Sequence, residues 1–229
     1  LKIVVQKPGG LSIRVGRHHA LDYEHGHVQS LASDVILTGG PVRRALALAA
    51  GSCGLPSSAR GRYLDAVRLL VAKLSAHGSG GILVFSADQA PEPAGETGYR
   101  TFPDISLASM LLHLHRAQSH AEHARHRNQE QDQLLVGALQ SELQHTIGEL
   151  GALTALDGAT VLDRALSLVG FGVVLPVGGA LAPVLEAQDV EAVNGQPVDL
   201  GGRGTRHRAA ATHAWNHPGC VVFVASQDG

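Results

Sequence analysis

The sequence predicts a layered fold of the α/β (α+β) class, in which a mixed, twisted β-sheet is flanked by helices. Hydrophobic residues make up 44% of the 229 residues, which is enough to bury a core. Aromatic residues make up only 3%, so Ala, Leu and Val must fill most of that core. Short apolar runs alternate with segments of helical periodicity, and this alternation favours a sheet covered by helices.

The charge balance argues against a general nucleic-acid-binding surface. The formal net charge is -2 and the isoelectric point is about 6.7, so no overall basic field exists to hold a phosphate backbone. Any anion must be bound by a local site. Cys53 and Cys220 lie far apart and show no metal-binding spacing, which favours two buried thiols in the reducing cytoplasm.

Residues 1–62 are expected to form a small β-rich accessory region that could act as a sensor. Glycine pairs separate short β-like runs, and a helix follows them. The histidines of this region are expected in surface loops: His18, His19 and His25. The expected strands are Lys2–Val5, Leu11–Val15 and Asp34–Leu37, and the expected helix is Pro41–Ala50.

Residues 63–229 are expected to form the main domain, which opens with a helix and a buried strand. Tyr63–Ala76 carries apolar residues at helical spacing. A glycine-rich turn then ends the helix before the apolar run Ile82–Phe85. A loop rich in Pro and Gly follows at Pro91–Gly98.

A helical hairpin is expected as an insertion over about residues 104–150. Asp104 or Ser106 could cap its first helix. Residues 117–133 contain no large aliphatic side chain, so they are expected to form a solvated helix or a mobile linker. A narrow apolar stripe then follows, which must pack on the domain or on a partner helix: Leu135, Leu139, Leu143, Ile147 and Leu150.

The last third of the chain returns to strands. Thr160–Leu162 reads as a strand, and the apolar stretch Ala165–Val177 reads as a buried strand pair or a strand and turn. That stretch is shorter than the roughly 20 residues that a membrane span needs, so no span is expected. A loop, a helix from Thr205 and a closing strand at Val221–Ala225 complete the domain.

A glycine-rich turn leads into a strongly basic helix start. Its sequence is Gly-Gly-Arg-Gly-Thr-Arg-His-Arg over residues 201–208. The first turn of a helix binds anions through its free N–H groups, and Arg suits phosphate because its planar fork donates two hydrogen bonds. The stretch lacks the Lys of a P-loop and does not follow a strand. The alternative is a solvated basic turn without a ligand.

A second motif, Asp157-Gly158-Ala159, precedes the expected strand at 160–162. Asp-Gly alone is a common turn signal, and this alternative stays open. In the functional interpretation, the carboxylate accepts a proton from a sugar hydroxyl, and the glycine allows a ligand to approach the backbone.

Together and in this order, the two motifs resemble the diadenylate cyclase (DAC) domain of the DisA type, which has a DGA motif followed by a GTRHR motif. The strand end Val173–Pro176 and the closing segment Phe223–Gly229 are also similar to that family. The clear resemblance covers residues 151–229, and a weaker one covers residues 64–85. It implies a DAC-type mixed sheet that binds one ATP per domain, with two domains facing each other.

The resemblance implies an activity and a role for each motif residue. The enzyme would condense two ATP into cyclic di-AMP and two pyrophosphates, with Mg²⁺ or Mn²⁺ as divalent cation and a homodimer or higher homo-oligomer as the working unit. The implied catalytic residues are Asp157, Gly158, Ala159, Arg206, His207 and Arg208. The implied nucleotide-binding residues are Leu175, Pro176, Gly204, Thr205, Arg206, Ser226 and Gln227.

Two departures from the family affect the metal side of the site. Leu156 stands where some members have a histidine, and the strand end has Gln227 and Asp228 where two acids are common. Asp228 is therefore the implied metal ligand, with ATP phosphates supplying the other oxygens. These departures motivate the alternative function, a catalytically weak or inactive nucleotide sensor. In a third interpretation, the helical hairpin is a partner-binding arm.

Three other signals are expected to be structural. The histidines 113, 115, 120, 123 and 126 lack a supporting Cys or Asp, so they indicate a solvated or pH-responsive helix rather than a zinc site. Trp215 is expected to pack its helix against the sheet. Cys220 is expected in the core rather than as a nucleophile.

Overall fold

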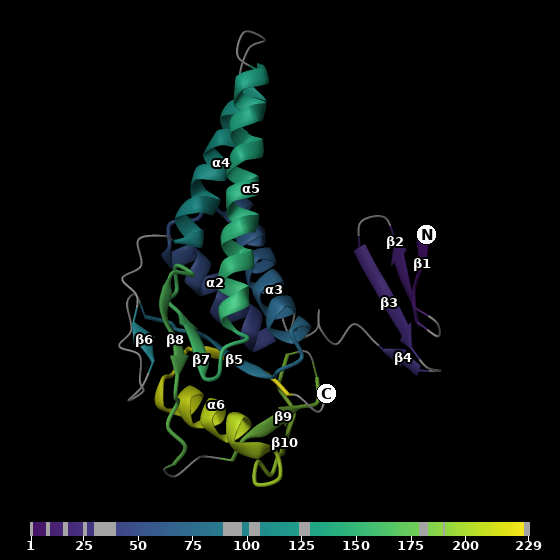
Figure 1. The fold of residues 1–229 in the computed structure, drawn as a ribbon, viewed down its shortest axis with the longest axis vertical. Coiled ribbons are helices and arrows are strands. Elements are labelled where there is room, and N and C mark those ends of the chain that lie inside the picture. The colour runs from purple at the N-terminus through teal and green to yellow at the C-terminus, as the bar shows by residue number, and fades with distance from the viewer. Residues whose placement is uncertain are drawn as a thin grey trace.

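The computed structural model describes residues 2–7, 10–15, 18–24, 27–29, 40–88, 98–100, 106–123, 129–178, 183–189 and 191–226. A five-stranded mixed sheet with the order β11-β5-β7-β8-β6 forms the centre of the larger unit (Figure 1). Helices cover this sheet, which confirms the expected mixed α/β class. The DAC-type variant of that class stays a prediction.

The strands of the central sheet are short, and they form both parallel and antiparallel pairs. β5 (Gly81–Phe85) runs parallel to β7 (Ala159–Leu162), and β11 (Val221–Ala225) lies antiparallel to β5. On the other side of β7, β8 (Leu168–Val173) is antiparallel to it, and β6 (Tyr99–Arg100) pairs with β8. The expected strands at 82–85, 160–162 and 221–225 are therefore confirmed.

Successive side chains of β7 point to opposite faces of the sheet, and the core has one layer on each face. Ala159 and Val161 pack with residues of α6 (Gly204–Asn216), whereas Leu162 packs with the helices on the opposite face. α6 covers its face alone among the described helices, and Figure 1 shows it below the sheet. α3 (Arg60–Ala76) lies on the other face and buries Val67 and Leu70 completely.

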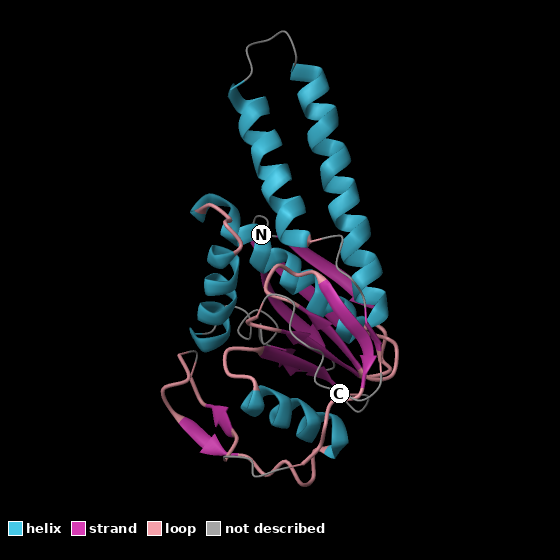
Figure 2. Ribbon diagram, turned by 90° about the vertical axis from the view of Figure 1, so that its left-hand side faces the viewer, coloured by secondary structure: helices cyan, strands magenta, loops and turns pink. Residues whose placement is uncertain are grey.

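The expected helical insertion is confirmed as a hairpin of α4 (Leu107–His123) and α5 (Gln129–Leu153). The two helices pack against each other and extend away from the sheet (Figure 2). The stretch expected as a solvated helix or linker is helical up to residue 123 and again from residue 129. Residues 124–128 lie outside the described part of the chain.

The base of the hairpin is fixed to the domain. Leu143 and Ile147 of α5 are buried in the core that α3 shares, as their helical spacing predicts. Ser106 accepts a hydrogen bond through its Oγ from the Ser109 N–H at 3.2 Å, so it caps α4 as expected.

The N-terminal strands form a separate antiparallel sheet in the order β1-β2-β3-β4. Their bounds are β1 Lys2–Lys7, β2 Gly10–Val15, β3 His18–Glu24 and β4 His27–Gln29. The first two strands were expected. The loop assignment of His18 and His19 is wrong, because these residues pair with Val15 and Arg14 in the ladder. The expected strand 34–37 and His25 lie outside the described residues.

Residues 40–62 pack with the larger unit. α2 (Gly40–Ser52) and the short 3₁₀ helix η1 (Ser57–Ala59) precede α3. Leu46 and Leu55 are 2% exposed in the same core as Phe223 of the central sheet. The boundary expected after residue 62 therefore cuts through elements that share one core.

Two further expectations need correction. The segment expected as a loop after residue 177 contains a small antiparallel hairpin of β9 (Leu185–Ala187) and β10 (Gly195–Pro197). Trp215 is 56% exposed, so it does not anchor α6 to the sheet. Ala209 and Ala210, on the buried side of α6, make that contact instead. No helix in the described residues is long and apolar enough to span a membrane.

Candidate functional site

The sheet topology brings the two sequence motifs to one end of the sheet. β5 and β7 are parallel and begin at this end, whereas their antiparallel neighbours β8 and β11 finish there. Asp157 lies just before β7, Leu175 just after β8 and Ser226 just after β11. Residues far apart in the sequence therefore meet at one edge.

A cavity of about 240 Å³ opens at this edge. Both motifs contribute to its wall: Asp157 and Gly158 come from one side, and Thr205 and Arg206 come from the start of α6. Apolar side chains provide the rest of the lining. They are Ile82, Val173, Val174, Leu175, Val177 and Ala209. An apolar pocket with a few polar groups at one side is typical of small-molecule sites.

Asp157 and Arg206 bring opposite charges together at the cavity. Arg206 Nη2 lies 3.7 Å from Asp157 Oδ1, and the Asp157 side chain is 99% exposed. The Gly158 N–H donates a hydrogen bond to the same carboxylate oxygen at 3.1 Å. An exposed ion pair contributes only about 0–1 kcal/mol to folding. The pair therefore places two charges beside the cavity without adding much stability.

The first turn of α6 is suited to an anion. The Arg203 side chain at the N-cap makes no capping hydrogen bond, and the first turn contains no acidic residue. The N–H groups of that turn carry a partial positive charge, to which Arg206 adds a full one. Gly204 has a φ of +79°, and this left-handed conformation turns the chain into the helix.

Backbone packing requires a glycine at position 158. Its φ is +103°, and a Cβ there would lie 2.6 Å from the backbone carbon of Gly172. These contacts explain the glycine through the fold. Because Gly158 also lines the cavity, the expectation that it lets a ligand approach the backbone stays a prediction. Its close neighbour is the backbone of β8, which itself has a positive φ of +63° at Gly172.

Ala159 and Leu175 are both buried, but they have different positions. Ala159 is 1% exposed, opens β7 opposite Val173, and packs in the layer under α6. Its side chain does not line the cavity, and the catalytic role expected for it stays a prediction. Leu175 is 4% exposed and lines the cavity, as expected. Pro176 is exposed and does not line the cavity.

The remaining motif residues lie around the cavity or outside the described residues. His207 is half-buried and Arg208 is exposed on α6, and neither lines the cavity. Ser226 is exposed at the same end of the sheet. Gln227 and Asp228 lie outside the described part of the chain.

The apolar lining shows what the motifs alone could not reveal. Ile82 is the second residue of the parallel neighbour of β7, and its alternation within β5 puts it on the α6 face. Ala209 follows Thr205 by four residues, which places both on one side of the helix. That helical spacing was visible in the sequence. The contribution of Ile82 from β5 could not be predicted, because it depends on which strands pair with one another.

The described residues contain no group of three or more His, Cys, Asp or Glu side chains that could hold a metal ion. Among the described residues that line this cavity, Asp157 is the only carboxylate. In the hairpin, His120 Nδ1 lies 3.5 Å from Asp132 Oδ1, so an Asp does stand beside this histidine, contrary to expectation. One such pair is too few ligands for zinc.

Neither cysteine has the lowered pKa that a nucleophilic thiol needs. Both thiols are free and half-buried. Burial raises the pKa of Cys220 to about 11, and it also raises the pKa of Cys53. A thiol with a raised pKa forms little thiolate near neutral pH. Cys220 was expected in the core, but it is only half-buried and belongs to neither core cluster of the described residues.

Comparisons of the chain with protein-family models, with curated proteins and with solved structures found no match. The cavity and its two motifs are therefore the basis on which a function can be inferred.

Proposed function

We propose that this protein is a diadenylate cyclase, which condenses two ATP molecules into cyclic di-AMP and releases two pyrophosphates. The observation that carries the proposal is the meeting of the two motifs at one cavity, with Asp157 and Arg206 3.7 Å apart. A chance turn and a chance basic helix start would have no reason to face the same cavity. A site that acts on a nucleotide needs both.

The cavity offers complementary surfaces for the parts of ATP. The apolar lining around Leu175 and Val174 suits the flat adenine ring. Thr205 and Arg206, together with the N–H groups of the first turn of α6, suit the phosphates. Arg208 lies on the same helix and would add positive charge near the triphosphate, and His207 could donate a hydrogen bond to it, although both residues lie outside the cavity wall.

In the proposed reaction, the 3'-hydroxyl oxygen of each ATP attacks the α-phosphorus of the other, so the following exchange of bonds takes place twice. A new oxygen–phosphorus bond forms, the bond to pyrophosphate breaks, and the hydroxyl proton passes to Asp157. Because its side chain is 99% exposed, the Asp157 carboxylate is accessible to a hydroxyl brought by a facing copy of the chain. Such a reaction depends on positioning and charge neutralisation more than on covalent catalysis.

Mg²⁺ or Mn²⁺ is part of the proposal as the ion that neutralises the phosphate charge. The described residues place one carboxylate at the cavity, so phosphate oxygens would have to supply most of its ligands. Asp228 remains the proposed protein ligand. The steps assigned above to Asp157 and Arg206 do not depend on the position of the ion.

A non-catalytic nucleotide sensor is the second candidate. Leu156, which is 45% exposed beside Asp157, favours it, because a leucine cannot coordinate the cation that the chemistry needs. Incubating the purified protein with ATP and either metal, followed by chromatography for cyclic di-AMP, separates the two candidates. Product supports the cyclase. ATP binding without product at high protein concentration supports the sensor.

A further inference from the structure

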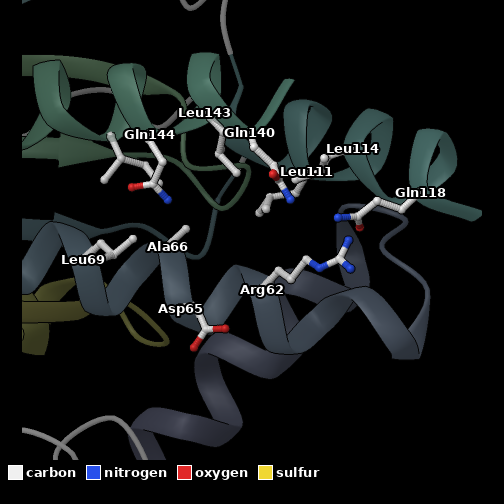
Figure 3. Close-up of a pocket in the computed structure, with 11 residues that line it drawn as sticks. Arg62, Asp65, Ala66, Leu69, Leu111, Leu114, Gln118, Gln140, Leu143 and Gln144 are labelled. Carbon is white, nitrogen blue, oxygen red and sulfur yellow. The ribbon is translucent and has the colours of Figure 1, made fainter. Parts of the chain in front are cut away.

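A second, larger cavity lies on the opposite face of the sheet from Asp157. It has a volume of about 350 Å³ and is formed where α3 meets the α4–α5 hairpin (Figure 3). This volume is within the range of about 300–1,000 Å³ that is usual for small-molecule pockets. No residue of the two motifs contributes to it.

The cavity has an apolar interior and a polar border. The apolar side chains come from all three helices. Leu69 is 38% exposed, and the other five are almost fully buried: Ala66, Leu111, Leu114, Leu143 and Ile147. Gln140 and Gln144 are exposed on α5 at its border. Such a lining favours a ligand with an apolar body.

A positive charge stands at one end of this cavity. Figure 3 shows Arg62 and Gln118 facing each other at the end away from Leu69. Arg62 Nη1 and Gln118 Oε1 are both buried and have no hydrogen-bond partner in the described part of the protein. An unpartnered buried polar atom destabilises a protein, and the cost is larger when the group is charged. A ligand that supplied the missing bonds would recover that cost.

Asp65, the one acidic residue among the described residues of the lining, does not neutralise Arg62. Asp65 Oδ1 is paired with Arg68 Nη1 at 3.2 Å, and the Asp65 side chain is largely exposed. The charge of Asp65 is therefore balanced on its own helix by Arg68. This leaves the guanidinium of Arg62 as the charge that a bound molecule would meet.

We propose that this cavity binds a small amphiphilic carboxylate, such as a medium-chain fatty acid. The carboxylate would accept hydrogen bonds from the Arg62 guanidinium, whose planar fork matches its two oxygens. The Gln118 amide would donate a further bond, because the two ends of an amide exchange by rotation of the side chain. The hydrocarbon chain would lie along Leu111, Leu114 and Leu143.

Such a ligand would join the hairpin to the body of the protein. Arg62 is on α3, whereas Gln118 is on α4, and the apolar wall is completed by α5. Binding would therefore hold α4 and α5 against α3. The site lies across the sheet from the proposed cyclase site and does not depend on that proposal.

Isothermal titration calorimetry with sodium octanoate tests the inference on the full chain. We expect saturable binding of one octanoate per protomer and no comparable binding of 1-octanol, which lacks the charge. Arg62→Gln should weaken octanoate binding at least tenfold. Arg43→Gln is the matched control, since Arg43 is exposed on α2 and does not line the cavity. It should leave the affinity unchanged.

A second variant keeps the test decisive if Arg62→Gln fails to fold, which circular dichroism would show. Gln118→Leu retains the shape of the wall and should still weaken octanoate binding several-fold. The proposal is overturned if the folded protein shows no saturable octanoate binding tighter than about 1 mM. It is also overturned if 1-octanol binds equally well, or if a folded Arg62→Gln protein binds octanoate as the wild type does.

Discussion

Asp157 of the loop before β7 and Arg206 of the first turn of α6 face each other across 3.7 Å at the edge of one cavity. Both side chains reach solvent, so their attraction contributes little to folding. The same exposure leaves both groups accessible to a ligand. Under the proposed function the pair acts on a bound nucleotide, so substitutions there should affect binding or turnover rather than stability.

Replacing Arg206 with glutamine should weaken ATP binding about tenfold or more. The change removes charge-assisted hydrogen bonds to phosphate, each of which contributes about 1.5–3 kcal/mol. Calorimetric titration with a non-hydrolysable ATP analogue measures the effect. Arg43→Gln, on exposed α2, should leave the affinity unchanged. Equal affinities for the two variants would mean that Arg206 does not hold phosphate.

Replacing Gly158 with alanine should destabilise the protein by about 2–4 kcal/mol. The new Cβ would lie 2.6 Å from the Gly172 backbone, and the residue would also be held at a φ of +103°. Gly54 is a matched control with a φ of +74°, and a Cβ added there would meet nothing within 4 Å, so Gly54→Ala should cost only about 1 kcal/mol. Urea unfolding measures both changes. A similar loss in both variants would show that the contact with Gly172 is unimportant.

His213 should make the protein less stable in mild acid. It is 6% exposed on α6, its ring stacks on His217 with centroids 4.3 Å apart, and its Nδ1 has no partner among the described residues. Burial, followed by the neighbouring His217, lowers the pKa of His213 from 6.5 to about 4. The folded protein therefore keeps this ring neutral where the unfolded chain already takes up a proton. Stability from this residue is complete above about pH 6.5 and is lost as the pH falls towards 4.

The size of this loss should be about 1–2 kcal/mol, less than the full pKa difference allows, because α6 lies near solvent. Unfolding free energies at pH 7 and at pH 4.5 measure it. His213→Leu should reduce the difference between the two pH values. His113→Gln, at an exposed position on α4, should preserve the wild-type difference. If His213→Leu also keeps the wild-type difference in unfolding free energy between the two pH values, other groups must be responsible for it.

Elements with strong apolar periodicity could be predicted from the sequence. α3, β5 and β11 begin and end within three residues of their expected positions, because each carries a clear apolar pattern and is bounded by glycine or by a turn. β9 and β10 were missed for the opposite reason. All their residues are exposed, so no apolar pattern marks them.

The site could be predicted only in part. Its charged residues were visible because Asp157 and Arg206 belong to recognisable motifs. The packing of Gly158 on Gly172 was not visible, since it depends on the irregular register between β7 and β8. The burial of Ala159 likewise follows from which face of the sheet α6 covers. Local sequence does not encode those relationships.

The most direct test of the central claim measures ATP binding and cyclic di-AMP formation in the same preparations of wild type, Asp157→Asn and the control Asp88→Asn. Asp88 is an exposed residue just past the opposite end of β5. With Mg²⁺ or Mn²⁺, wild type and control should convert ATP to cyclic di-AMP. Asp157→Asn should bind ATP with unchanged affinity. Its rate of product formation should fall at least about 100-fold, because it has lost its proton acceptor. ATP binding by wild type without any cyclic di-AMP, or undiminished turnover by Asp157→Asn, would contradict the account.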